Sequence, residues 1–168
     1  MKKIGLISDT HAYIDPSVFK YFEKVDEIWH AGDIGSEEVS DRLAAFKPYK
    51  AVYGNIDGGK LRTMHPKNLH FMCERVKVFM THIGGPALKY NEEVRKQILE
   101  QSPALFICGH SHILKVIFDK KFNMLYMNPG AAGIHGFHKV KTLLRFSVDE
   151  DKIKDLEVIE LGHRSSSH

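Results

Sequence analysis

The sequence predicts an α/β fold of four layers, an α/β/β/α sandwich in which two mixed sheets pack together between outer helices. Three observations lead to this prediction. Short apolar runs alternate with helical patterns over the first two thirds of the 168 residues, and strand-like runs alone fill the last third. The conspicuous polar motifs all follow apolar runs, and the ligands of α/β sheets gather at the carboxyl ends of strands.

The first part of the chain is expected to alternate strands with helices. Asp15 as N-cap and Pro16 at the first helical position start one helix, and Ser36 caps a second helix that ends before Pro48. Residues 58–68 lack a clear period and are expected to form a loop. The strands around these elements are expected at 4–8, 26–31 and 51–53.

The middle of the chain predicts a hairpin and one more helix. Apolar residues over 69–73 and 76–81 indicate two strands that turn at residues 74–75. Asn91 opens a charged helix that ends before Pro103. Its inward side chains are expected to be Val94, Ile98 and Leu99.

From residue 104 onward every apolar run predicts a strand. These runs are 104–108, 113–118, 124–127, 142–148 and 153–159. A chain of this length is expected to form a single domain, here residues 1–161. Residues 162–168 are mostly polar and are expected to be a disordered tail.

The composition argues against several classes of protein. With 24 Lys and Arg against 21 Asp and Glu, the net charge is +3, and no Lys/Arg run exceeds two residues. A dedicated nucleic-acid or membrane surface is therefore not expected, and no run approaches the ~20 apolar residues of a membrane span. Cys73 and Cys108 lie far apart without a CxxC pattern, so we expect buried free thiols and a cytoplasmic protein. Whether it forms a homo-oligomer stays open.

Histidine is over-represented, with 11 in 168 residues, and four of them belong to five short polar motifs. The motifs are Asp9-Thr10-His11, Gly32-Asp33, Gly54-Asn55-Ile56-Asp57, Thr81-His82 and Gly109-His110-Ser111-His112. Carboxylates, an amide oxygen and imidazoles suit a pair of divalent first-row ions. Each motif alone is more often a plain turn or a satisfied core histidine, but the five in series predict a metal site. Asp57 is expected to orient a ligand imidazole.

This series of motifs resembles that of the calcineurin-like metallophosphoesterases, and the Gly-Asn-Ile-Asp form resembles their small bacterial and archaeal phosphodiesterase branch. The resemblance runs from Lys2 to about Phe146 and implies the metallophosphoesterase fold. It also implies that Asp33 bridges two ions. Asp9, His11 and His112 would complete the coordination of one ion, and Asn55, His82 and His110 that of the other.

The resemblance implies a phosphoric ester hydrolase, most specifically a phosphodiesterase that cleaves small phosphate diesters with a hydroxide bridging the two ions. Asp33, Asn55 and His82 would act through the metals, with Mn²⁺ as the expected ion and Ni²⁺, Zn²⁺ or Fe as alternatives. A scaffold similar to the phosphoesterase-like subunit of retromer is the competing interpretation. All seven ligand positions carry a ligand-competent residue, which favours the enzyme. A nuclease would need a basic groove, which the sequence lacks.

The residue that protonates the leaving group is not evident from the sequence. Ile56 stands where many larger relatives have a histidine that assists the leaving group. His135 and His138 follow an Asn-Pro-Gly-Ala turn and are candidates for a proton donor or a substrate contact, the alternative being a solvent-facing loop. His30 is expected in the core or in contact with a metal ligand from behind. The histidines expected to face solvent are His65, His70, His163 and His168.

Overall fold

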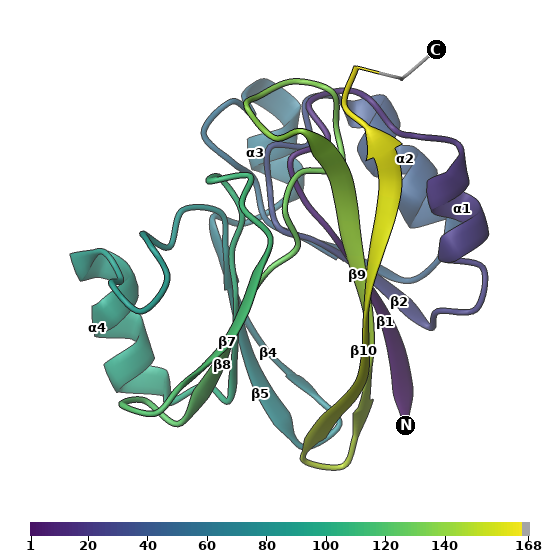
Figure 1. Ribbon diagram of the computed structural model, residues 1–168. Coiled ribbons are helices and arrows are strands. Elements are labelled where there is room, and N and C mark those ends of the chain that lie inside the picture. The colour runs from purple at the N-terminus through teal and green to yellow at the C-terminus, as the bar shows by residue number, and fades with distance from the viewer. Residues whose placement is uncertain (166–168) are drawn as a thin grey trace.

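The computed structural model describes residues 1–165 and has the four layers that the sequence predicts (Figure 1). Two five-stranded sheets pack together, with strand orders β10-β9-β1-β2-β3 and β4-β5-β6-β8-β7. The first sheet comprises β1 (Lys2–Ile7), β2 (Glu27–His30), β3 (Tyr49–Ala51), β9 (Val140–Asp149) and β10 (Lys152–His163). The second comprises β4 (Asn68–Cys73), β5 (Val76–Thr81), β6 (Leu105–Ile107), β7 (Lys115–Asp119) and β8 (Met124–Asn128).

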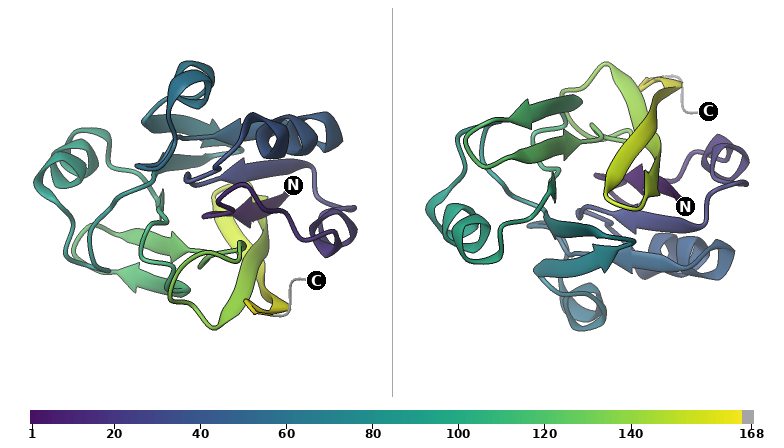
Figure 2. Two further views of the ribbon diagram at one scale, coloured as in Figure 1. Left: turned by 90° about the horizontal axis from the view of Figure 1, so that it is seen from above. Right: turned by 90° about the horizontal axis from the view of Figure 1, so that it is seen from below.

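Both sheets are mixed. In the first, β1 pairs in parallel with β2 and antiparallel with β9, and in the second β6 runs parallel to both β5 and β8. Helices α1 (Ser17–Tyr21) and α2 (Glu37–Phe46) cover the outer face of the first sheet, and α4 (Glu92–Gln101) covers that of the second (Figures 1 and 2).

The main core lies between the sheets and is centred on one tryptophan. Trp29 on β2 is fully buried, and its ring contacts Phe71 of the opposite sheet edge-on, with the ring centroids 4.9 Å apart. Phe146 of β9 meets the same ring at 5.8 Å. Edge-to-face pairs of this kind add about 0.5–1.5 kcal/mol beyond the area that they bury. The aromatic contact therefore helps to hold the two sheets in one relative position.

Two of the helix starts follow directly from their capping residues. The Ser36 hydroxyl accepts a hydrogen bond from the Val39 N–H, and the Asn91 side chain accepts one from the Val94 N–H. Each therefore satisfies one of the N–H groups that a helix leaves unpaired at its start. No helix within residues 1–165 is long and apolar enough to cross a membrane.

Helix α1 begins one residue later than expected, with Pro16 rather than Asp15 at the N-cap, although the Asp15 carboxylate still accepts the Ser17 N–H at 2.9 Å. Three further expectations from the sequence are wrong in detail. Residues 58–68 are not all loop, because Gly59–Met64 forms helix α3, which has no side-chain cap and buries only Leu61. The Leu99 side chain, expected to point inward, is 60% exposed, because α4 buries only a narrow stripe through Val94 and Ile98. A short helix with one buried residue and a narrow buried stripe both produce too little apolar periodicity in the sequence to be predicted.

The third correction concerns the expected tail from residue 162. Gly162 and His163 belong to β10 and pair with Lys141 and Val140 of β9, so the long antiparallel ladder orders them. Residues 166–168 of that tail lie outside the described residues.

The two cysteines are as expected. Cys73 and Cys108 are free and buried, and burial raises the pKa values of their thiols to about 11 and about 12.

A buried carboxylate at the start of β2 ties together neighbouring strands of the first sheet. Glu27 accepts hydrogen bonds from Trp29 Nε1 at 2.9 Å and Lys50 Nζ at 3.0 Å, and also from Lys2 Nζ. Burial alone would raise the pKa of Glu27, but the three donors outweigh it and lower that pKa to about 2. The ionised carboxylate therefore stabilises the fold.

We expect Glu27→Gln to flatten the acid dependence of stability. A carboxyl group whose pKa is lowered by folding stabilises the protein above its unfolded pKa, and that stability is lost as the pH falls through the folded pKa. Between about pH 5 and pH 2 the wild type should lose on the order of 2 kcal/mol that the variant, already without the charge, does not lose. Urea unfolding across this pH range measures the difference. Exposed Glu23→Gln is the control, and parallel profiles for wild type and Glu27→Gln would contradict the expectation.

Candidate metal centre

The five polar motifs converge at one end of the sandwich, where the strands of both sheets deliver them. Loops after β1, β2 and β3 carry residues from the first sheet, and loops after β5 and β6 carry residues from the second. Two groups of potential ligands result, and the ligand atoms of each group lie within 4.8 Å of one another. The groups are Asp9, His11 and His112, and Asp33, His82 and His110.

Asp33 stands between the two groups. Its Oδ2 atom lies 3.4 Å from Nε2 of His11 in one group and 3.2 Å from Nε2 of His82 in the other. Asn55 joins the second group, since its amide oxygen is 3.0 Å from Nδ1 of His110. The structure thus brings all seven candidate ligands together, with one carboxylate placed where two ions could share it.

Several buried polar atoms of this cluster have no hydrogen-bond partner. They are Asp9 Oδ1, His11 Nε2 and His82 Nε2. A buried polar atom without a partner costs about 1–3 kcal/mol, so nearly all such atoms in native proteins are satisfied. An ion held by the first group would satisfy Asp9 Oδ1 and His11 Nε2, and an ion held by the second group would satisfy His82 Nε2. These nitrogen and oxygen donors therefore fit first-row metal ions.

The electrostatics of the cluster also favour added positive charge. Burial alone would raise the pKa of Asp9 and of Asp33, but the surrounding histidines outweigh it and hold both pKa values well below the usual range. The Asp33 and Asp9 carboxylates raise the pKa of His11 to about 9. The carboxylates thus stay ionised and attract cations, either protons on the imidazoles or metal ions.

Most of the candidate ligands have an unusual backbone conformation. Five of the seven have φ between 46° and 70°, in the left-handed region that residues other than glycine rarely adopt. They are Asp9, His11, Asp33, His110 and His112. Such residues cluster at functional sites and cost on the order of 1 kcal/mol or more each. The chain must turn sharply at each strand end, and this turn directs neighbouring side chains to one point.

Two glycines allow the ligand loops to come close together. A Cβ on Gly54 would overlap the carboxylate and backbone nitrogen of Asp33, and one on Gly109 would lie 2.7 Å from Oδ2 of Asp9. Glycine immediately before Asn55 and before His110 is therefore a steric requirement of the site.

Asp57 has a different role from the one expected. It contacts no ligand imidazole, and its carboxylate instead fastens the loop after β2 to the loop after β3 through backbone N–H groups. The donors are Ile34 at 3.1 Å, Gly35 at 2.8 Å and Gly54 at 2.8 Å. The imidazole of His82 is oriented by main chain, since its Nδ1–H donates to the carbonyl oxygen of Ala31 at 2.8 Å.

His135 and His138 both lie beside the first group of ligands. The exposed ring of His135 stacks on His11 with centroids 5.1 Å apart, and the ring of His138 meets His112 edge-on at 5.1 Å. Nε2–H of His138 donates to the Gly133 carbonyl at 2.7 Å, and burial lowers the pKa of His138. The His138 proton is thus already used, whereas His135 is open to a ligand.

Other polar residues lie behind the ligands: Ser8, which the sequence did not single out, and His30, which was expected in the core or behind a ligand. Ser8 donates a hydrogen bond to Oδ2 of Asp9 at 2.7 Å, and His30 is fully buried with Nε2 3.0 Å from the Thr10 hydroxyl. Burial lowers the pKa of His30 to about 4, so the ring is neutral. Polar residues at the ends of buried strands were the available signal.

Three of the remaining histidines, His65, His70 and His163, belong to none of the ligand groups. His65 was expected to face solvent but is half-buried, because its ring lies between the Ser40 hydroxyl of α2, 2.8 Å from Nε2, and the Tyr49 ring of β3. His70 and His163 are exposed, and His168 lies outside the described residues.

Comparison with known proteins agrees with this geometry. The family model of the calcineurin-like phosphoesterase superfamily domain matches residues 1–151. The chain belongs to the calcineurin-like phosphoesterase superfamily. It is 30% identical over 158 residues to a probable metallophosphoesterase of Methanocaldococcus jannaschii, covering 90% of this chain and 78% of that protein. A probable metallophosphoesterase of Methanothermobacter thermautotrophicus is 28% identical over 164 residues, covering 95% and 92%.

Solved structures share the fold at lower identity. A structure described as a novel archaeal phosphodiesterase superposes with a TM-score of 0.71 at 22% identity, covering 94% of this chain and 99% of that one. Vps29 of Chaetomium thermophilum gives a TM-score of 0.75 at 15% identity, covering 97% and 100%. A protein described as a phosphodiesterase and Vps29 thus share this architecture.

We expect the purified protein to bind two divalent ions per chain, measured by elemental analysis after Mn²⁺ loading and gel filtration. His82→Ala and His110→Ala should each reduce the content to about one ion, because each removes a ligand from the second group alone. Asp33→Ala should reduce it further, because both groups lose the shared carboxylate. His70→Ala, on the outer face of the second sheet, is the control and should keep two ions. Less than one ion per wild-type chain would contradict the expectation.

Proposed function

We propose that this protein is a metal-dependent phosphodiesterase that hydrolyses small phosphate diesters. The observation that carries the proposal is the position of Asp33, whose one carboxylate oxygen faces a histidine of each ligand group. Family membership and the name of one structural neighbour support it. When bound, two divalent ions would lower the pKa of an attacking water and neutralise charge on the phosphoryl oxygens.

The seven candidate ligands would have different roles in holding the two ions. Asp33 would hold both ions at a fixed spacing, and the amide oxygen of Asn55 and the imidazole of His82 would complete the second site without adding negative charge. Asp9, His11 and His112 would hold the first ion. His110 would also bind the second ion. The side chains of Asn55 and His110 are exposed, so substrate can reach the second site from their side.

The cations near the second group favour a singly charged diester over a doubly charged monoester. Arg62 and Lys67 share a cavity with Asn55 and His82. The Arg62 guanidinium lies over the Tyr53 ring and donates to the main chain of Asp57, while Lys67 pairs with Glu93 at 3.0 Å. Glu93 neutralises Lys67, so Arg62 is the cation lining this cavity that keeps an uncompensated charge, which matches the single negative charge of a diester.

A scaffold role is the second candidate. Apolar side chains from separate loops are exposed near the ligand motifs, among them Ile56, Ile83, Ile113 and fully exposed Phe137. The fold similarity to Vps29 is compatible with this candidate. The complete set of seven ligand-competent residues favours the enzyme, because binding a partner does not require it.

We expect hydrolysis of bis(4-nitrophenyl) phosphate by the Mn²⁺-loaded protein, followed as release of 4-nitrophenolate. Chelation should abolish turnover, and Mn²⁺ should restore it, with Ni²⁺, Zn²⁺ and Fe²⁺ compared in parallel. Asp33→Asn should lower kcat by at least about 10²-fold, because the neutral amide is a poor bridge. His70→Ala is the control. Retained metal with no turnover of any diester would favour the scaffold.

We expect His135 rather than His138 to assist the leaving group. His135→Ala should slow an alkyl ester about 10²-fold or more and an aryl ester little, because only an alkoxide needs a proton. His138→Ala should slow both classes equally, since its proton is held by Gly133 and its ring supports His112. A plot of log kcat/KM against leaving-group pKa separates the two roles. Equal slowing of both ester classes by His135→Ala would show that His135 only binds substrate.

A further inference from the structure

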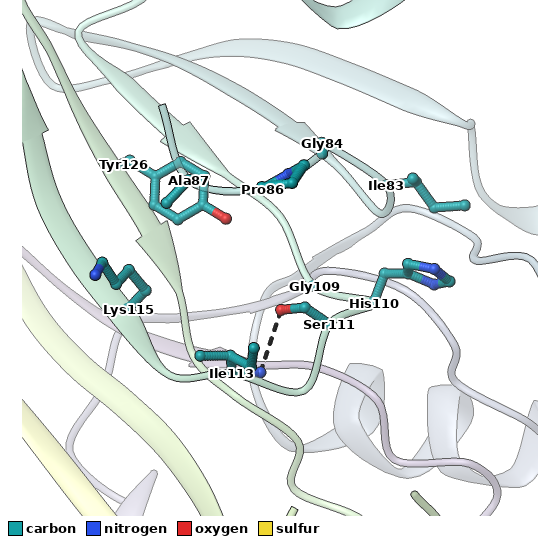
Figure 3. A pocket seen from close by; sticks show the side chains of 11 residues that line it. Ile83, Gly84, Pro86, Ala87, Gly109, His110, Ser111, Ile113, Lys115 and Tyr126 are labelled. Atoms are coloured by element: carbon teal, nitrogen blue, oxygen red, sulfur yellow. Dashed lines mark hydrogen bonds between the residues drawn. The ribbon is translucent and has the colours of Figure 1, made fainter. Parts of the chain in front are cut away.

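An apolar pocket opens beside the second ligand group and has no role in the chemistry described above. Its volume is about 440 Å³, and His110 and Ser111 form one end of it. Tyr126 and Lys115 form the opposite end (Figure 3). The pocket therefore leads from a candidate metal ligand to a region that no candidate ligand occupies.

The walls of the pocket are apolar on both sides. Pro86 and Ala87 line one side and Ile113 lines the other, with Ile83 next to His110 (Figure 3). Ile83 is 41% exposed and Ile113 is 64% exposed, which is a large apolar surface to leave uncovered beside a polar site. Bound ligands usually cover such walls, with a few polar groups that fix their orientation.

The back of the pocket rests on the buried core. A Cβ on Gly84 would lie 2.8 Å from the Phe106 ring and 3.2 Å from Cys108, so the glycine backbone packs directly on the core. Tyr126 is almost fully buried, and its hydroxyl oxygen accepts from the Cys108 thiol at 3.1 Å. Its own hydroxyl proton can therefore be donated to an acceptor atom of a ligand.

We propose that this pocket binds an aromatic or heteroaromatic ring on the non-leaving side of the phosphate diester. This inference rests on the proposed function and names its substrate class. His135 and His138 lie beside His11 and His112, whereas the pocket adjoins His110 of the other ligand group. A leaving group directed towards His135 leaves the second substituent of the ester to enter the pocket.

The test compares two diesters with the same leaving group, phenyl 4-nitrophenyl phosphate and methyl 4-nitrophenyl phosphate. After correction for their alkaline hydrolysis rates, the phenyl ester should have a kcat/KM roughly tenfold or more above that of the methyl ester. Ala87→Phe, which fills the pocket, should bring the ratio close to one. Ile113→Ser, at an exposed position that does not threaten folding, should lower it about threefold or more.

Leu99→Ser on α4 is the matched control, because Leu99 is 60% exposed and does not line the pocket. It should keep the wild-type ratio. Calorimetry with phenylphosphonate and methylphosphonate gives a readout without turnover, and the phenyl compound should bind more tightly only when the pocket is open. Equal kcat/KM for the two esters, or a phenyl preference that survives both pocket variants, would overturn the inference and leave the diesterase intact. Absence of turnover of both esters would overturn the proposed function and the inference together.

Discussion

The buried carboxylate of Asp33 is the constraint on which the site depends. One oxygen accepts the Ile56 N–H at 3.0 Å, and the other faces His11 and His82. A loop that carries such a charge must surround it closely, which explains why Gly54 touches Asp33 and why Asp57 fastens the two loops together. The position of one charge thus determines the backbone of two loops and the approach of two imidazoles.

A bound cation would offset two unfavourable features of the site, the backbone strain at the ligand positions and the unpaired polar atoms of the cluster. Left-handed residues and unpaired buried polar atoms both destabilise a fold, and here they occur in the same few loops. The strands that carry them are among the most buried parts of the molecule, as the burial of β1, β2 and β6 shows. A rigid core can therefore hold a preorganised site whose unfavourable terms a bound cation would offset.

The sequence predicts the layers, the caps of α2 and α4 and the convergence of five motifs, because each of these depends on local patterns that repeat. It does not predict α3, whose uncapped start at Gly58–Gly59 and single buried Leu61 lack such a pattern. It assigns Asp57 to an imidazole because spacing along the chain cannot show which loop lies opposite. The stacking of His135 on His11 joins residues 124 positions apart, and only the tertiary structure reveals it.

The two sides of the ligand cluster are built by different loops, and this separation has a consequence for specificity. The loop between β8 and β9 carries His135 and His138 to the first ligand group, whereas residues 83–87 after β5 form a wall of the pocket beside the second. None of the residues 83–87 is a candidate ligand, and Phe106 and Cys108 support Gly84 from the core. Changes at the exposed positions of this wall can therefore alter which ester substituent fits while the ligands keep their geometry, because the strands rather than the wall position them.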